Sequence, residues 1–358
     1  MESTSLPFDQ VIEGNCIDVL AGFPAESVDV VFADPPYNLQ LSQELWRPNL
    51  TAVDAVDDAW DQFSDFAEYD RFTRAWLTAC RRVLKPEGTL WVIGSYHNIF
   101  RVGSILQDLD FWILNDVIWI KNNPMPNFRG VRLTNAHETL IWAQKERGNK
   151  YTFNHHALKM LNDDLQMRSD WYLPICTGKE RLRLNGVKAH STQKPASLLY
   201  RIMIASTNPG DVVLDPFFGT GTTGIAARLL QRHWIGIERN ADYVNIARQR
   251  IAEIEQFPIE ALNTTPNPRR IPRLPFGLLV ETGLLTPGQT LYFTLKRTAT
   301  ARVCADGALE MDGKRGSIHT MARSLHPGPC NGWQMWFYED PQSGQLKPVD
   351  ELRKQLRG

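Results

Sequence analysis

Cysteine is scarce in this chain of 358 residues, and its five cysteines are scattered without a C-x-x-C pair. Neither a disulfide framework nor a zinc site is therefore indicated. The adjacent His155 and His156 also lack a spaced carboxylate or cysteine partner, which is more typical of polar surface than of a metal site. No apolar run is long enough to cross a membrane, and no basic, apolar signal region begins the chain. These absences predict a cytoplasmic protein that holds no metal.

A large net charge of either sign is missing as well, because the total is only −1. The charges are nevertheless unevenly distributed. Residues 1–120 hold 7 Lys and Arg against 19 Asp and Glu, whereas residues 121–201 hold 14 against 6 and residues 259–358 hold 13 against 9. Basic segments attract phosphates, so these two parts of the chain are candidates for contact with nucleic acid. A basic surface without such a function is the alternative.

A first chemical motif follows the apolar, β-branched run Val28–Ala33, which has the composition of a buried strand in a parallel sheet. The next residues are Asp34, Pro35, Pro36 and Tyr37. Ligands bind at the carboxyl ends of strands in open α/β sheets, and two prolines leave carbonyl acceptors beside the carboxylate without N–H donors. This cluster suits an amino group on an aromatic base that rests on the tyrosine ring. An ordinary surface Asp-Pro turn is the alternative.

A second motif lies far downstream, where an apolar strand from Val212 leads through a glycine-rich turn into a helix. The turn contains a G-x-G-x-x-G at residues 219–224, a weak signal alone, and Glu238 follows roughly 20 residues later, where an acid can hold ribose hydroxyls. Asp215 stands before the turn and is placed to receive a positive group rather than a pyrophosphate. A ligand with an amine, a ribose and no phosphate fits S-adenosylmethionine.

Both motifs resemble those of the β-group adenine-specific DNA methyltransferases, in which D-P-P-Y precedes D-P-F-x-G-x-G-T. More narrowly, the chain resembles the cell-cycle-regulated GANTC methyltransferase of α-proteobacteria and its restriction-system relatives. The resemblance runs nearly end to end and includes residues 33–40 (ADPPYNLQ), 91–99 (WVIGSYHNI), 123–128 (NPMPNF), 135–139 (NAHET), 193–195 (QKP) and 330–333 (CNGW).

The resemblance implies methyl transfer from S-adenosylmethionine to the N6 amino group of adenine in duplex DNA, at GANTC, with the base flipped out and attacked directly. The implied catalytic residues are Asp34, Pro35, Pro36 and Tyr37. The implied cofactor-binding residues are Cys16, Ile17, Asp18, Asp34, His190, Ser191, Lys194, Asp215, Phe217, Phe218, Gly219, Gly221, Thr222, Thr223, Glu238 and Arg239. The implied DNA-binding residues are Asn38, Leu39, Gln40, Arg47, Asn127, Arg129, Arg132, Lys159, Arg168, Ser317, Asn331 and Trp333.

Strands alternate with helices over residues 1–257, which predicts one doubly wound, mainly parallel sheet, and the resemblance implies the seven-stranded methyltransferase form. Residues 121–190 interrupt the alternation with basic and aromatic side chains and are interpreted as an inserted target-recognition region. Five prolines mark residues 258–275 as a linker. Residues 276–358 predict a small β-rich domain that binds DNA by resemblance; by pattern alone it could serve dimerisation or folding. The expected helices span residues 71–84, 99–109, 197–206 and 241–255, and expected strands include 90–94, 112–120, 137–143, 233–237, 290–295 and 301–304.

The stretch from Asn38 to Asp70 is too long for an ordinary loop. Because it is attached to the first motif, it is a candidate lid or strand-separating element that contacts DNA; a solvated acidic insertion is the alternative. Relatives tend to have Gly-Gly where this chain has Ser42-Gln43, and Asp where it has Asn15.

Several functional alternatives stay open. An RNA or amino-cytosine methyltransferase is one, and a DNA-recognition protein that has lost catalysis is another, which the intact Asp34 and Tyr37 argue against. The resemblance also implies a homodimer associated with the nucleoid. The sequence does not separate a solitary enzyme from one paired with a restriction nuclease.

Overall fold

The chain forms two compact units, Met1–Asn267 and Pro268–Gly358, and each is described by itself. The computed structural model describes residues 6–38, 45–46, 52–53, 61–127, 130–184, 187–188, 193–262, 274–326, 328 and 330–356. Six residues of the predicted site lie outside this range: Leu39, Gln40, Arg47, Arg129, His190 and Ser191.

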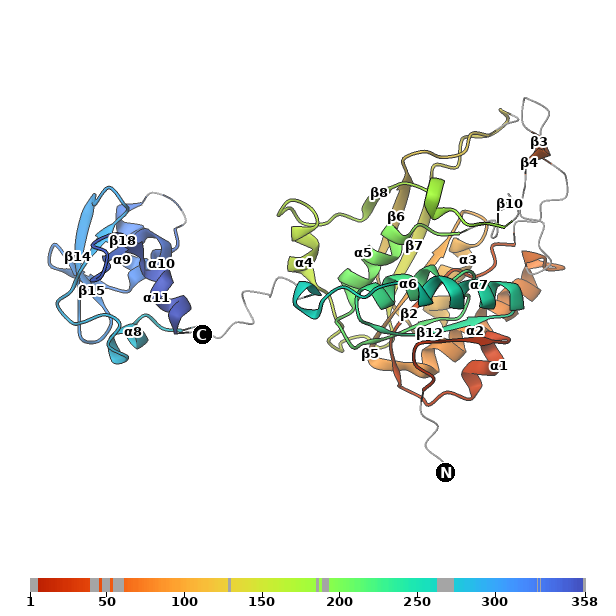
Figure 1. The fold of residues 1–358 in the computed structure, drawn as a ribbon, viewed down its shortest axis with the longest axis horizontal. Helices are drawn as coiled ribbons and strands as arrows, with labels where there is room; N and C mark the ends of the chain where they lie inside the picture. The colour runs from red at the N-terminus through yellow and green to blue at the C-terminus, as the bar shows by residue number, and fades with distance from the viewer. Residues whose placement is uncertain are drawn as a thin grey trace. The chain divides into compact units, whose positions relative to one another are not determined.

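The first unit is built on an eight-stranded sheet in the order β1-β12-β11-β2-β5-β7-β6-β8 (Figure 1). Every neighbouring pair is parallel except the two pairs that involve β7. The predicted α/β sheet is confirmed, and its mainly parallel, seven-stranded form only in part, because the sheet is mixed and β8 adds an eighth strand. The strands are β1 (Gln10–Glu13), β2 (Val28–Ala33), β5 (Leu84–Gly94), β6 (Trp112–Lys121), β7 (His137–Gln144), β8 (Asp170–Leu173), β11 (Val212–Asp215) and β12 (His233–Glu238).

Helices cover both faces of the sheet, as the doubly wound prediction requires (Figure 1). Successive side chains of β2 point to opposite faces of the sheet and so enter two separate cores. Val31 and Ala33 pack with Trp76 on one face, while Val30 and Phe32 pack on the other. The helices of this unit are α1 (Cys16–Ala21), α2 (Phe66–Val83), α3 (Ile99–Asp108), α4 (His155–Met160), α5 (Ala196–Ser206), α6 (Thr222–Leu229) and α7 (Ala241–Ala252), with 3-10 turns at Gly178–Glu180 and Ile259–Leu262. Two small hairpins pair β3 (Leu45–Trp46) with β4 (Ala52–Val53) and β9 (Arg183–Leu184) with β10 (Val187–Lys188).

Helix α2 begins five residues before the predicted start because its amino terminus is capped. The Asp65 carboxylate accepts the Glu68 N–H at 2.7 Å, and the Glu68 carboxylate in turn accepts the Ser64 N–H at 2.8 Å. This reciprocal pairing satisfies donors that a helix start leaves free. At its other end α2 stops at Val83, because the Lys-Pro-Glu-Gly segment that was expected to end the helix already belongs to β5.

The second unit contains a six-stranded antiparallel sheet in the order β16-β15-β14-β13-β17-β18. Its strands are β13 (Thr290–Phe293), β14 (Ala299–Val303), β15 (Leu309–Met311), β16 (Lys314–Gly316), β17 (Trp336–Glu339) and β18 (Leu346–Pro348), and its helices are α8 (Gly277–Glu281), α9 (Ile318–Leu325), α10 (Gly332–Met335) and α11 (Val349–Gln355). These helices were not predicted from the sequence. In α9, Ile318, Met321, Ala322 and Leu325 recur at helical spacing behind a Ser317 cap, which is the signal that was overlooked.

No helix in the described parts of either unit combines the length and the apolar character that spanning a bilayer demands.

Candidate active site

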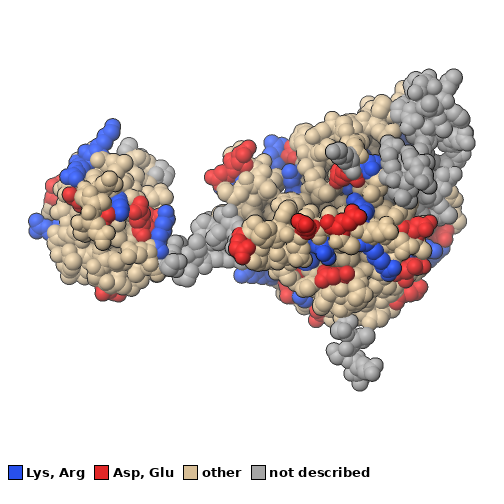
Figure 2. All heavy atoms as spheres, viewed as in Figure 1, with Lys and Arg blue, Asp and Glu red and all other residues tan. Residues whose placement is uncertain are grey.

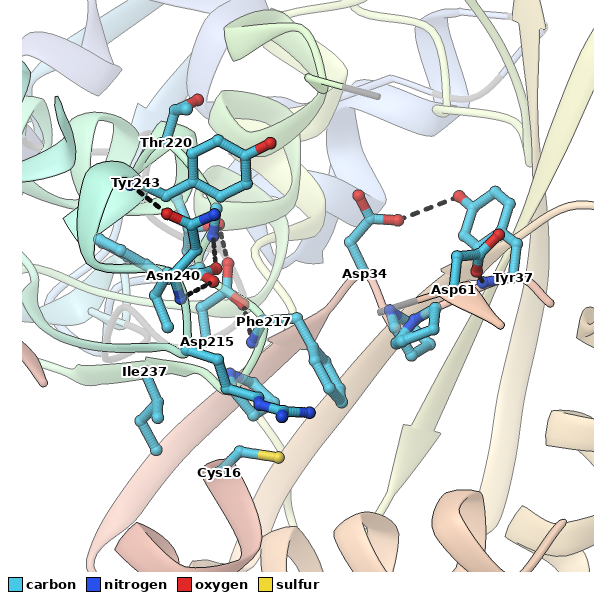
Figure 3. A pocket seen from close by; sticks show the side chains of 18 of the residues that line it. Cys16, Asp34, Tyr37, Asp61, Asp215, Phe217, Thr220, Ile237, Asn240 and Tyr243 are labelled. Carbon is cyan, nitrogen blue, oxygen red and sulfur yellow. Dashed lines mark hydrogen bonds between the residues drawn. The ribbon is translucent and has the colours of Figure 1, made fainter. Parts of the chain in front are cut away.

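A cavity of about 350 Å³ opens at the carboxyl edge of the main sheet, where β2, β11 and β12 end (Figure 3). Parallel strands bring their carboxyl ends to one edge, so the two motifs meet although they lie far apart in the chain. The lining includes Asp34 and Tyr37 from the first motif and Asp215 from the second. The size falls within the range of small-molecule sites.

The glycine-rich turn between β11 and α6 shapes one wall of this cavity. Gly219 and Gly221 have φ angles of +52° and +85°, in the left-handed region that other residues rarely adopt. At Gly221 a Cβ would also lie 2.9 Å from the Cβ of Ala247 in α7. The turn can therefore bring its backbone close to a ligand only with glycine at these positions.

Asp215 lies at the base of the turn and is almost fully buried. One carboxylate oxygen accepts the Phe217 N–H at 2.9 Å, and the other accepts the Thr223 hydroxyl at 2.5 Å. Burial raises the pKa of Asp215 to about 7 although these hydrogen bonds lower it, and the nearby Asp34 and Glu238 also raise it. A carboxylate in this position is stabilised by a cationic ligand group.

Glu238 closes β12 on the same side of the cavity. Its carboxylate oxygens accept the N–H groups of Gly219 at 2.8 Å and Asn240 at 2.8 Å, so the side chain is fixed between the glycine-rich turn and the start of α7. Burial raises the pKa of Glu238 against these hydrogen bonds. Its carboxylate is an acceptor in a place where ligand hydroxyls can donate to it.

The Asp34–Tyr37 turn is held by an acceptor, Asp61, and a donor, Tyr69, from elsewhere in the chain. The Asp61 carboxylate accepts the N–H groups of both Tyr37 and Asn38, the second at 2.8 Å. The Tyr69 hydroxyl donates to the Pro36 carbonyl at 3.0 Å. These contacts fix a turn in which prolines supply no N–H, and Figure 3 shows the Asp61 carboxylate against the backbone at Tyr37.

A buried charge cluster surrounds the Asp34 carboxylate. The Lys194 ammonium lies 2.8 Å from Asp34 and 3.7 Å from Glu138, and the Lys121 ammonium lies 2.8 Å from Glu138. The Tyr37 hydroxyl lies 3.0 Å from an oxygen of each carboxylate. Burial raises the pKa of Asp34 against the effect of Lys194, whereas at Glu138 the two lysines outweigh burial and lower the pKa.

The structure brings most predicted cofactor residues to the cavity, but not all. Ile17 and Asp18, both on α1, do not line the cavity. Ile17 packs against the core, and Asp18 is exposed. Gly221 shapes the turn without lining the cavity. The predicted residues that do line it are Cys16, Asp34, Lys194, Asp215, Phe217, Phe218, Gly219, Thr222, Thr223, Glu238 and Arg239.

Sequence reasoning missed several residues of the site. Asp61 belongs to the stretch from Asn38 to Asp70, for which the sequence predicts only a lid or an acidic insertion, and Glu138 belongs to the segment 135–139, to which the sequence assigns no individual roles. A further lining group comes from α2 and from the start of α7, namely Phe72, Asn240 and Tyr243. The N-cap spacing of Asn240 before Asp242 was a detectable signal, whereas no local pattern indicated Asp61.

The predicted DNA-binding residues within the described range have mixed environments. Asn38 is buried beside the Asp34–Tyr37 turn, and the Asn127 side chain accepts the Val131 N–H. Lys159 and Arg168 are paired with nearby carboxylates, and Arg132 is exposed. In the second unit Ser317 and Asn331 are exposed helix caps, whereas Trp333 is only 5% exposed and packs in the core. The Trp333 ring therefore cannot stack on a base in this arrangement.

Charged side chains of both signs are interspersed over the face of the molecule shown in Figure 2. Within the described residues, no three His, Cys, Asp or Glu side chains are grouped as metal ligands would be. His155 and His156 pack edge to face at the start of α4.

Comparison with known proteins relates both units to DNA-modifying enzymes. A family described as DNA methylase matches residues 28–249, and one described as restriction enzyme adenine methylase associated matches residues 258–358. The type II methyltransferase M.HinfI of Haemophilus influenzae is 50% identical over 332 residues, or 92% of this chain and 91% of that protein.

Two solved structures show the same fold. The complex of M1.HpyAVI with S-adenosylmethionine matches with a TM-score of 0.51 and 25% identity, over 68% of this chain and 98% of that one. The cytosine-N4-specific PvuII DNA methyltransferase matches with a TM-score of 0.53 and 23% identity, over 70% of this chain and 89% of that one. At that identity the second likeness concerns the fold alone.

The role of Asp61 as the anchor of the turn can be tested by Asp61→Ala. The change leaves two buried N–H groups without an acceptor, and each such group costs about 1–3 kcal/mol. We expect the free energy of unfolding in urea to fall by about 2 kcal/mol or more. Asp65→Ala is the matched control, because it removes only an exposed helix cap worth about 1 kcal/mol. Equal losses in the two variants would contradict the anchoring role.

Proposed function

This chain belongs to the DNA methylase family as an adenine-specific, S-adenosylmethionine-dependent DNA methyltransferase, and from this premise we propose that it methylates adenine within GANTC. The observation that carries the chemistry of the proposal is the meeting of Asp34 and Asp215 at one cavity, with a turn rich in acceptors beside a buried site for a cation. The GANTC assignment comes from the sequence resemblance.

We propose that the Asp215 side of the cavity holds S-adenosylmethionine, which supplies an electrophilic methyl group when bound. The buried Asp215 carboxylate, whose pKa is raised, suits the positive end of that molecule, and the Glu238 carboxylate suits its ribose hydroxyls. The left-handed glycines let the turn approach it closely. The residues present in the cavity therefore fit this cofactor.

We propose that the Asp34 side receives the target amino group. The Asp34 carboxylate and the Pro35 carbonyl would accept its two hydrogens, which orients the nitrogen lone pair toward the methyl group. The Pro36 carbonyl is already an acceptor for Tyr69, which favours Pro35 in this role. Lys194 lies over the Tyr37 ring, 5.1 Å from its centroid, so a stacked base has to use the opposite ring face.

An adenine inside a duplex cannot reach a carboxylate at the edge of a sheet, which supports flipping of the base out of the helix. The inserted region 121–190 would recognise the target, since it carries the strongest excess of basic residues. We infer a restriction-modification setting, because M.HinfI is a type II methyltransferase. A cell-cycle role is the alternative, and a nuclease gene beside the coding sequence would decide between them.

Methylation of defined duplexes tests the main proposal. With labelled S-adenosylmethionine, we expect N6-methyladenine only in a duplex that contains GANTC. Asp34→Ala should lower the rate of methylation by about 100-fold or more, because a catalytic base is lost. Cofactor binding should be largely kept. Label in cytosine or RNA would point to the alternative substrates, and label outside GANTC would overturn the site. Lost cofactor binding in Asp34→Ala would mean that the roles of the two motifs are misassigned.

Cofactor affinity should depend on pH through Asp215. The cofactor's cationic amino group favours the ionised carboxylate, whose pKa is about 7, so binding releases a proton when the pH is below that value. We expect calorimetry to show the Kd rising about tenfold for each pH unit below 7 and levelling above it. Asp215→Asn is the matched control and should bind weakly with a flatter profile. The same slope in both proteins would assign the effect to another group.

We also propose that the second unit contributes to DNA binding and that the enzyme is a nucleoid-associated homodimer. The second unit has its own core, which includes Trp333 and Trp336, so a chain ending at residue 267 leaves the first unit intact. We expect this truncation to weaken binding of a GANTC duplex at least tenfold and to reduce its salt dependence, with unchanged cofactor affinity. Light scattering of both proteins reports dimerisation. If the truncated protein bound DNA as tightly as the full chain, the second unit would have a structural role and no part in DNA binding.

A further inference from the structure

We propose that Glu138 is a positioning residue for methyl transfer: it turns the Tyr37 hydroxyl away from Asp34, so that Asp34 can take and hold the proton released by the target amino group. This inference rests on the proposed function of the cavity. It gives a role to a side chain on β7 that no motif of the cofactor or catalytic turn includes.

The geometry follows from the single proton of a phenol. The Tyr37 hydroxyl has an oxygen of Asp34 at 3.0 Å and an oxygen of Glu138 at 3.0 Å, but it can donate to only one of them. If it donates to Glu138, its own oxygen presents a lone pair to Asp34. The contact between Asp34 and Tyr37 is then a hydrogen bond only when Asp34 carries a proton.

The charges around the cluster favour this arrangement. Glu138 faces the ammonium groups of Lys121 and Lys194, which keep it ionised and therefore the better acceptor for the phenol. The two lysines lower the pKa of Glu138 in spite of its burial. Among the described residues, Asp34 is paired with Lys194 and lies near the like charges of Glu138 and, further away, Asp215; burial raises the pKa of Asp34. Both carboxylates are ionised at rest, and a proton that reaches the pair therefore belongs on Asp34 rather than on Glu138.

The proton movement can be written with every atom accounted for. The amino nitrogen forms its bond to the methyl carbon as the carbon–sulfur bond breaks, which leaves the nitrogen with one proton too many. That proton passes to Asp34, which then donates a hydrogen bond to the Tyr37 oxygen while Tyr37 continues to donate to Glu138. Asp34 returns to its ionised form by losing the proton to solvent after the product departs.

The arrangement resembles the logic of a catalytic triad, in which a buried carboxylate orients a second group that acts on the base or nucleophile. Loss of the negative charge at residue 138 should let the Tyr37 hydroxyl turn toward Asp34. A hydrogen bond donated to Asp34 stabilises its ionised form, so Asp34 becomes a weaker base with a lower pKa.

The test is the pH dependence of single-turnover methylation of a GANTC duplex by Glu138→Gln, which is close in size to the natural residue. We expect the acid limb of the profile to move to lower pH by about one unit and the maximal rate to fall about tenfold, with unchanged cofactor Kd. Glu26→Gln is the matched control, because Glu26 also pairs with a buried lysine, Lys145, but lies away from the cavity. Its profile should match that of the unaltered enzyme.

The route through the hydroxyl is tested by repeating the change in Tyr37→Phe, which keeps the ring. If Glu138 acts through Tyr37, Glu138→Gln should have a much smaller effect in this background than in the unaltered enzyme. An equal effect in both backgrounds, or a Glu138→Gln profile superimposable on that of the unaltered enzyme, would overturn the inference. An unaltered enzyme that forms no N6-methyladenine would instead overturn the proposed function itself.

Discussion

The ion pairing of the buried Lys194 ammonium is the interaction on which the Asp34 side of the cavity depends. The ammonium lies between the carboxylates of Asp34 and Glu138, and all three side chains are mostly withdrawn from water. Two like charges this close and this buried would repel each other, and removal of a buried partner charge typically costs several kcal/mol. With Lys121 on the far side of Glu138, the cluster contains two cations and two anions, so it can be buried as a neutral group.

The reversal of β7 explains how Glu138 reaches this cluster. The strands on either side of β7 run the other way, so their carboxyl ends and the first residues of β7 lie at the same edge of the sheet. Thr139 is paired with Gly94 at the end of β5, and Ala33 at the end of β2 is paired with Val92. A parallel strand in the place of β7 would have delivered its last residues to the site. The one reversed strand therefore contributes a residue that a purely parallel sheet could not provide in this register.

Local sequence patterns were sufficient to predict the parts of the site that follow strands directly. Asp34 and Asp215 each follow or end a short β-branched strand, and Glu238 closes another, so their meeting at one edge follows from the α/β class alone. Asp61 and Glu138 could not be found in this way. Asp61 lies 24 residues after Tyr37 in the chain, and the place of Glu138 in the site depends on the direction of its strand and on Lys121 and Lys194 from separate segments.

The boundaries of helices and strands, and the elements of the second unit, were likewise predicted only where the local sequence pattern is clear. Long strands such as β6 and β7 were predicted to within a residue or so, since each contains a run of apolar residues that marks it clearly in the sequence. The start of α2 was not predicted, because the sequence of its acidic capping segment resembles that of a loop. In the second unit, short helices such as α9 have few turns and so show only a brief periodic pattern; Ser317 and Asn331, which the resemblance implies as DNA-binding residues, are helix caps.

The tether of Asp61 to the backbone of Tyr37 and Asn38 has a consequence for how such enzymes can diverge. The chain leaves the Asp34–Tyr37 turn at Asn38 and returns to it at Asp61, so hydrogen bonds hold the two ends of the intervening segment together. Closure entropy grows slowly with length, and even a doubling of the loop costs only about 0.6 kcal/mol. Insertions and replacements there can accumulate at little thermodynamic cost while the reacting groups keep their positions. The length of this segment and the geometry of the turn are thus free to evolve at different speeds within one protein.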